Sequence, residues 1–176
     1  MFQKIIEKIN LKYPIDVVSK KSDKLMFLTV HKNTAVNTVQ YLKDDLGFKH
    51  LVLLTAVDFL EQGKFQLTYL LNNPDIKIDI GVRVLIERES ATMESAHSLW
   101  PTIATYQREL REMFGIDFPD SPGVNDEFIL EGWNNTPPYR RDFDTKAFAA
   151  NFYHQRNSRE NNDPSAHMKK NLYPNE

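Results

Sequence analysis

A dense group of ionisable side chains in this 176-residue sequence lies within residues 107–112. Arg108 and Glu112 are four positions apart and Glu109 lies beside them, so a helix would place all three charges together. Such a cluster could polarise a substrate, or it could be a solvated helix face, because exposed pairs at this spacing stabilise a helix only weakly. The spacing by itself does not choose between these functions.

Aromatic residues and a glycine follow this cluster. Gly115 can adopt a positive φ at no steric cost, so the chain can turn there and present Phe114 and Phe118 beside the charges. A charge cluster flanked by aromatic rings resembles an interface anchor. We therefore expect this region to contact another protein and not to catalyse a reaction.

A second charged group consists of Arg140, Arg141 and Asp142. The two guanidinium groups could form charge-assisted, partly bidentate hydrogen bonds with carboxylates. The partners could be Glu109 and Glu112 of the same chain or carboxylates of another protein. Both alternatives remain open, with a preference for another protein.

The sequence shows no motif for catalysis or for binding a metal ion or a cofactor. Asp58, Glu87 and Glu89 lie on different expected elements, and no Ser or Thr stands in a nucleophile elbow, phosphate loop or triad setting. No two histidines have the helical spacing of a metal site, and the six scattered glycines make no dinucleotide fingerprint. We expect no catalytic, metal or cofactor-binding residue. The histidines are His31, His50, His97, His154 and His167.

The composition excludes further classes of protein. A net charge of −2 gives no positive field for nonspecific binding of nucleic acid. The absence of cysteine removes the thiolates that iron–sulfur clusters and structural zinc usually need. Charges interrupt the first eight residues and no apolar run is long enough to cross a membrane, so we expect a soluble protein that starts in the cytoplasm.

The periodicity predicts an α+β domain over residues 1–116 that positions the charge clusters. We expect a mixed, mostly antiparallel sheet of about four strands with helices packed on it, because apolar residues alternate in some segments and recur every three or four positions in others. Helices are predicted at residues 1–10, 33–46 and 99–114, and strands at 24–30, 48–58, 65–71 and 76–86.

Residues 117–176 are predicted to be a long extended tail, because prolines punctuate them and little of the segment is periodic. The tail nevertheless carries more aromatic side chains than a solvated linker usually does, Trp133 among them. These rings need a surface to bury against. The tail should therefore wrap a partner protein, the alternative being a disordered terminus with incidental aromatics.

Two motifs resemble a known family. Residues 107–118, QRELREMFGIDF, resemble the Glu-Arg-Glu, Asp-Met-Phe-Gly-Ile signature of the 30 kDa (C-type) subunit of respiratory complex I, and residues 138–143, PYRRDF, resemble a later element of that family. Looser agreement covers residues 50–144. Gln107 stands where the family usually has Glu and Glu112 where it has Asp, and residues 121–127 lack the family's arginine pair.

The resemblance implies a cofactor-free, non-catalytic scaffold subunit of the hydrophilic arm of NADH:quinone oxidoreductase. Electron transfer from NADH to quinone, coupled to ion translocation, would use NADH, FMN, iron–sulfur clusters and quinone bound by other subunits. The implied partners are the 49 kDa-type (D-type) subunit and neighbouring cluster-bearing subunits. The implied location is the cytoplasmic side of the bacterial inner membrane, as a peripheral protein held there only through the complex.

Two other functions remain alternatives. The same kind of subunit serves group 4 membrane-bound hydrogenases and F(420)-linked dehydrogenases, which differ in the electron donor. A stand-alone binding protein, whose tail captures a ligand or peptide, belongs to another class. Under the scaffold hypothesis, the interface residues are Arg108, Glu109, Glu112, Phe114, Gly115, Phe118, Trp133, Arg140, Arg141 and Asp142.

Overall fold

The computed structural model describes residues 2–152, apart from the side chain of Phe152. The part of the expected tail beyond residue 152, which includes His154 and His167, lies outside the described residues. The chain divides into two compact units after Asp142, and each unit is described by itself.

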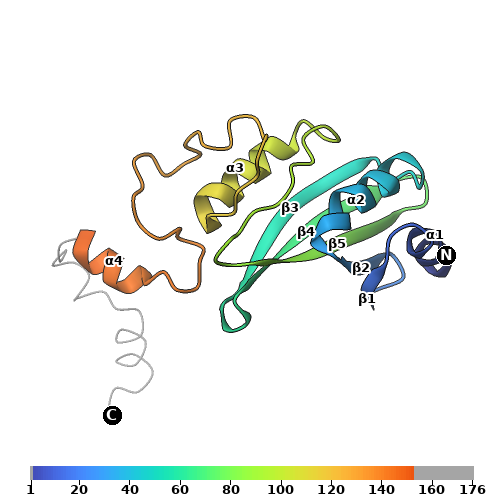
Figure 1. Ribbon diagram of the computed structural model, residues 1–176, viewed down its shortest axis with the longest axis horizontal. Helices are drawn as coiled ribbons and strands as arrows, with labels where there is room; N and C mark the ends of the chain where they lie inside the picture. The colour runs from blue at the N-terminus through green and yellow to red at the C-terminus, as the bar shows by residue number, and fades with distance from the viewer. Residues whose placement is uncertain (1, 153–176) are drawn as a thin grey trace, which may run out of the picture. The chain divides into compact units, whose positions relative to one another are not determined.

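The first unit is built on a five-stranded sheet with the strand order β1-β2-β5-β4-β3 (Figure 1). β2 and β5 are parallel, and the other neighbouring strands are antiparallel. β3 and β1 are therefore the edge strands. The strands are β1 (Ile15–Lys20), β2 (Leu25–Val30), β3 (His50–Phe59), β4 (Lys64–Asn73) and β5 (Ile78–Glu87).

Alternating apolar residues place one face of this sheet in the core. Along β4, Phe65, Leu67, Tyr69 and Leu71 are fully buried. They lie opposite residues of β5 that are also buried, as in the pair Tyr69 and Val82. The period of two along each strand thus decides which side chains meet the helices.

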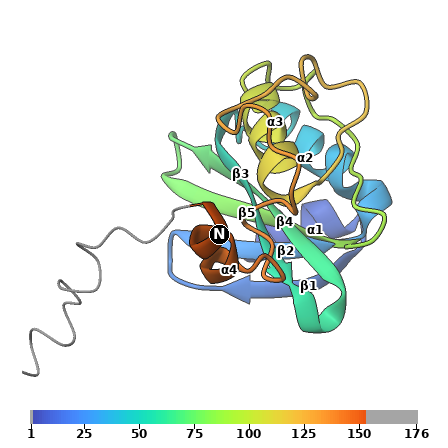
Figure 2. The ribbon, with the colours of Figure 1, turned by 90° about the vertical axis from the view of Figure 1, so that its left-hand side faces the viewer.

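Helices cover that face of the sheet. α2 and α3 lie on the same side of the strands (Figure 2), and α1 packs against α2. α4 belongs to the second unit. The helices are α1 (Phe2–Asn10), α2 (Ala35–Asp44), α3 (Ile103–Phe114) and α4 (Thr145–Phe152), with short 3-10 turns η1 (Lys32–Thr34) and η2 (Leu60–Gln62).

The predicted fold class is confirmed, with two local differences. The strand Ile15–Lys20 was missed because its side chains are mostly exposed and show no apolar alternation, so its place at the sheet edge depends on pairing with β2. A helix, Thr145–Phe152, forms within the segment that was expected to be extended.

The first compact unit also continues beyond residue 116, to Asp142. Ile116 and Phe118 are fully buried and Val124 is 8% exposed, all three in the same core as the sheet. Some of the apolar side chains of residues 117–142 are therefore buried against this chain, while others stay exposed. The proline-rich composition predicted the lack of regular structure there but not this packing.

Candidate functional site

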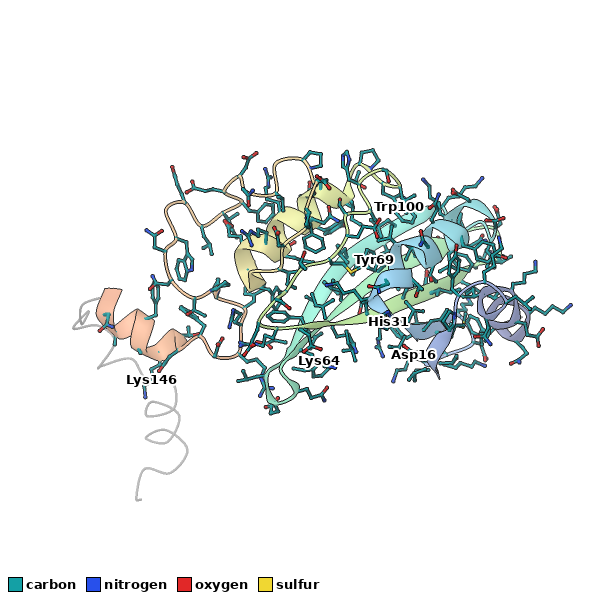
Figure 3. All side chains as sticks on the ribbon, in the orientation of Figure 1. Asp16, His31, Lys64, Tyr69, Trp100 and Lys146 are labelled. Atoms are coloured by element: carbon teal, nitrogen blue, oxygen red, sulfur yellow. The ribbon has the colours of Figure 1, made fainter. Side chains whose placement is uncertain are left out.

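α3 is fixed on the edge strand β3 by two side chains whose polar atoms reach backbone carbonyls. The Trp100 Nε1 donates to the Lys49 carbonyl at 2.8 Å, and the Tyr106 hydroxyl donates to the Val52 carbonyl at 3.1 Å. Figure 3 shows Trp100 beside the start of α3 and Tyr69 in the interior between the helices and the sheet. The helix that carries the charge cluster is thus held in one position along β3.

The end of α3 has the geometry that the glycine predicted. Gly115 has φ 78° and ψ 22°, and its N–H bonds back to the carbonyls of Leu110 and Arg111. After this left-handed turn, Asp117 pairs with the backbone of residues 91–93 through hydrogen bonds of 2.8 and 2.9 Å. The turn therefore changes the direction of the chain, so that Asp117 lies beside residues 91–93.

The aromatic rings on either side of this turn lie in the chain's own core. Phe118 is fully buried and Phe114 is 8% exposed. Phe114 packs edge-on between Phe65 and Tyr139, with ring centroids 5.9 and 5.7 Å apart. Of these rings, Tyr139 is the exposed one, at 57%.

Glu112 binds the segment that follows the helix. Its carboxylate accepts the N–H groups of Phe128, Ile129 and Leu130 at 2.8 to 2.9 Å. Partial burial raises the pKa of Glu112, but these three donors and the charge of Arg108 outweigh it, so the pKa lies below its ordinary value. Glu112 therefore folds residues 128–130 onto α3.

The other members of the helix cluster have different surroundings. The Arg108 guanidinium lies over the ring of Phe128, 5.3 Å from its centroid. Gln107 is fully buried, and its Oε1 accepts hydrogen bonds from the hydroxyls of Ser95 and Ser121 at 2.9 and 2.6 Å. An uncharged residue suits this enclosed position.

A network of charges forms where β3 and β5 end. Asp58, whose side chain is 1% exposed, accepts two hydrogen bonds from Arg88, at 3.0 and 3.2 Å. Arg88 also contacts Asp142 at 2.6 Å, and the backbone N–H of Arg141 donates to Asp58 at 2.8 Å. The network ties the end of the first unit to the sheet.

The outer members of the network are more exposed. Arg140 forms a bidentate pair with Asp142, at 3.1 Å for each bond, and Arg141 pairs with Glu61 at 2.6 Å. Hydrogen bonds from Arg140 and Arg88 lower the pKa of Asp142, while the bonds to Asp58 raise the pKa of Arg88. The charged forms are therefore favoured on both sides of the network.

The structure brings the two sequence clusters into the same unit but not into direct contact. Arg140 pairs with Asp142 and Arg141 pairs with Glu61, while the backbone N–H of Arg141 donates to Asp58. Glu109 and Glu112, one of the two alternatives left open by the sequence, are not the carboxylates that these arginines bind. Arg88 and Glu61 were missed. The sequence could have indicated them through Asp58, which shares the two-residue period of the core-facing residues of its strand. A buried carboxylate needs a cationic partner, so an arginine near Asp58 was to be expected.

Trp133 belongs to the segment held by Glu112. Its Nε1 donates to the carbonyl of Thr136 at 3.2 Å. The ring lines a groove of about 380 Å³ between the end of α3 and residues 124–137, together with Arg111 and Glu127. This residue is thus partly buried against its own chain.

The described residues contain neither a candidate metal site nor a candidate membrane-spanning helix. Between residues 2 and 152, no three or more acidic or histidine side chains gather in a way that could hold a metal ion. No helix in this part of the chain has the length and apolar character needed to cross a membrane.

Comparison with known proteins gives consistent matches. The family model for the 30 Kd subunit of respiratory-chain NADH dehydrogenase matches residues 28–149. The C/D subunit of NADH-quinone oxidoreductase from Hydrogenobaculum sp. (strain Y04AAS1) is 32% identical over 148 residues, which are 83% of this chain and 25% of that protein. This chain therefore spans about a quarter of the length of that relative.

Two further matches cover most of both chains. The C subunit of the F(420)H(2) dehydrogenase from Methanosarcina mazei is 26% identical over 142 residues, which are 80% of this chain and 90% of that protein. A chain in the structure of the membrane-bound sulfane sulfur reductase, an archaeal respiratory membrane complex, has a TM-score of 0.80 at 23% identity and covers 88% of this chain and 92% of that one. The structural match shows a shared fold.

Proposed function

Because this chain belongs to the family of the 30 kDa subunit of respiratory-chain NADH dehydrogenase, we propose that it is a scaffold subunit in the hydrophilic arm of an NADH:quinone oxidoreductase. It holds neighbouring subunits in position while electrons pass from NADH to quinone and ions are translocated. The family match over residues 28–149 carries this proposal, since it includes the strands β3, β4 and β5 and the segment that follows α3.

The proposal assigns no redox group to this chain. The sequence has no cysteine to ligate an iron–sulfur cluster, and no glycine-rich motif to bind a dinucleotide. NADH, FMN, iron–sulfur clusters and quinone would be bound by other subunits. The contribution of this chain to turnover is then the spacing and orientation of those subunits.

The proposed neighbour is the 49 kDa-type (D-type) subunit, together with cluster-bearing subunits. The Hydrogenobaculum relative, a C/D subunit, supports this choice because its name joins the two types in one protein. The side chains available for contact include Arg141, 54% exposed, and Tyr139, 57% exposed. Attachment at the cytoplasmic side of the bacterial inner membrane would occur through the complex.

A second candidate is the same role in an F(420)-linked dehydrogenase. The observation that favours it is the Methanosarcina relative, 90% of whose length is covered by this chain. The mechanics of the scaffold would be identical. The electron donor and the neighbour that receives its electrons would differ.

Purification from native membranes tests the proposal. A tagged full-length chain should co-purify with a D-type subunit and cluster-bearing subunits in a particle that oxidises NADH with a quinone as acceptor. Oxidation of F(420)H(2) in place of NADH would select the second candidate. A monomer that brings no such subunits from gently solubilised membranes would contradict both.

Replacement of Arg140 and Arg141 tests the interface. The double variant Arg140→Ala, Arg141→Ala should reduce the amount of chain recovered in the complex. Because both arginines also pair within this chain, the melting temperature of the isolated variant is measured in parallel. The matched control, Lys64→Ala, removes an exposed pair with Glu87 and should assemble normally. Normal assembly of the double variant would contradict this interface.

A further inference from the structure

A groove of about 420 Å³ runs along the outer edge of β3. One wall consists of Leu53, Leu54, Thr55 and Ala56, four consecutive strand residues, and the other includes side chains of α3 such as Leu110. Successive side chains of a strand point to opposite faces, so a groove that touches four in a row lies at the edge and not over one face. β3 is the last strand in the sheet order.

Within residues 2–152, hydrogen bonds from outside the sheet reach both ends of this edge, at the Val52 carbonyl and at the Asp58 side chain, but none reaches the strand residues between them. The hydroxyl of Tyr106 reaches the Val52 carbonyl at one end, and the backbone N–H of Arg141 reaches the Asp58 carboxylate at the other. Between them, over residues 53–57, no described residue adds another strand. An edge strand presents unpaired N–H and C=O groups, which an extended segment can complete.

Glu109 is the charged side chain among the residues that line this groove. It is partly buried, and within residues 2–152 it has neither an ion pair nor a hydrogen bond. Glu112, one helical turn further, differs because it accepts three backbone N–H groups. A partly desolvated carboxylate on an apolar wall favours a cationic partner.

We propose that an extended segment of a partner protein adds to the outer edge of β3 at residues 53–57, with an apolar side chain in the groove and a lysine or arginine paired with Glu109. This inference rests on the proposed function, since it needs a partner within a complex. It specifies the mode of contact as strand addition. A second copy of this chain fits less well, because symmetric pairing of β3 would bring the two Glu109 carboxylates together.

Hydrogen–deuterium exchange tests the backbone part of the proposal. Peptides that cover residues 53–57 are followed in the isolated full-length chain and in the purified complex. The outer-edge amides should exchange at least about tenfold more slowly in the complex, because strand addition gives them acceptors. Residues 64–73 of β4, which has a neighbouring strand on each side, serve as an internal control, since their amides are protected in both states.

Substitution of Glu109 tests the ionic part. Glu109→Lys should lower recovery of the chain in the complex by about tenfold or more, since it places like charges together, and Glu109→Gln should lower it less. Glu131→Lys changes an exposed acid outside the groove and should assemble normally. Melting temperatures of the isolated variants show whether the first unit stays folded.

The outcomes separate this inference from the proposed function. Co-purification with unchanged exchange at residues 53–57 would overturn strand addition and leave the scaffold role standing. Protection already present in the isolated chain would mean that its own residues cover the edge, which also overturns the inference. Failure to co-purify with any other component of the complex would overturn both. Normal assembly of Glu109→Lys would remove the ionic contact.

Discussion

At the scale of single residues, burial separates carboxylates that look alike in the sequence. Asp58 is 1% exposed and binds Arg88, whereas Glu61, only three positions later, is 66% exposed and binds Arg141. An enclosed ion pair cannot lose one partner without leaving a charge unpaired in a poorly solvated place. An exposed pair is screened by water and contributes little.

Asp58→Asn should therefore destabilise the first unit strongly. We expect the free energy of unfolding to fall by about 3 kcal/mol, because Arg88 loses its most buried partner. Urea denaturation of the full-length chain measures this. The matched control, Glu61→Gln, should leave the denaturation midpoint unchanged, and equal effects of the two substitutions would contradict the assignment.

Two tyrosines give a second matched pair. The Tyr69 hydroxyl is buried and has no hydrogen-bond partner among the described residues, and burial followed by the charge of Glu94 raises its pKa. Tyr69→Phe should leave stability unchanged or increase it, because an unpaired buried hydroxyl is costly. Tyr106→Phe should lose about 1 kcal/mol with the bond to Val52. Thermal unfolding measures the stability of both variants. A larger loss of stability for Tyr69→Phe than for Tyr106→Phe would contradict this prediction.

The depressed pKa of Glu112 predicts a dependence on pH. Its stabilising effect is complete above the ordinary pKa of 4.5 and is lost as the pH falls through the lower pKa of the folded state. The stability difference between the wild-type chain and Glu112→Gln should therefore shrink as the pH falls from 7 to about 3. Melting temperatures across this range measure it. Glu131→Gln should follow the wild-type curve, and a constant difference for Glu112→Gln would refute the role of the charge.

At the scale of elements, the end of α3 decides the path of residues 117–142. The left-handed Gly115 reverses the chain, which then packs Phe118 into the core and returns to bond Tyr139 N–H to the Met113 carbonyl at 3.0 Å. The helix end and the following segment are therefore one structural feature. A change in the turn should affect both.

Gly115→Ala should destabilise this feature by about 1 kcal/mol, because a residue with a Cβ is strained at positive φ. Urea denaturation measures the loss. Thr105→Ala, at an exposed position of the same helix, should have no cost, since alanine favours helix. If both variants were equally stable, the turn would not need glycine.

At the scale of the whole molecule, the compact unit ends at Asp142 rather than with the last helix of the sheet domain. The charge network at Asp58 and Arg88 holds that end in place. The second unit begins at Phe143, and its described part includes α4. The wrapping role proposed for the tail therefore concerns this second unit first.

Two truncations locate the boundary. A chain that stops after residue 142 should unfold with the same melting temperature as the first unit of the full-length chain, but it should enter the complex poorly. A chain that stops after residue 116 should be unstable, because it lacks Phe118 and the backbone donors that bind Glu112. Circular dichroism on heating measures both. A stable 116-residue product would place the boundary where the helix pattern had put it.

The sequence by itself determined the α+β class, the core faces of β4 and β5, and the left-handed turn at Gly115, because each depends on local period or local sterics. It also determined the family, since residues 107–118 and 138–143 carry its motifs. Tertiary structure alone decided the partners of the charges. Asp58 and Asp142 both bind Arg88, and Glu112 binds residues 128–130. These residues are far apart in the chain, so no periodic pattern in the sequence predicts that they are in contact. The edge strand Ile15–Lys20 and the packing of residues 117–142 also depend on contacts with distant segments, so only the tertiary structure shows them.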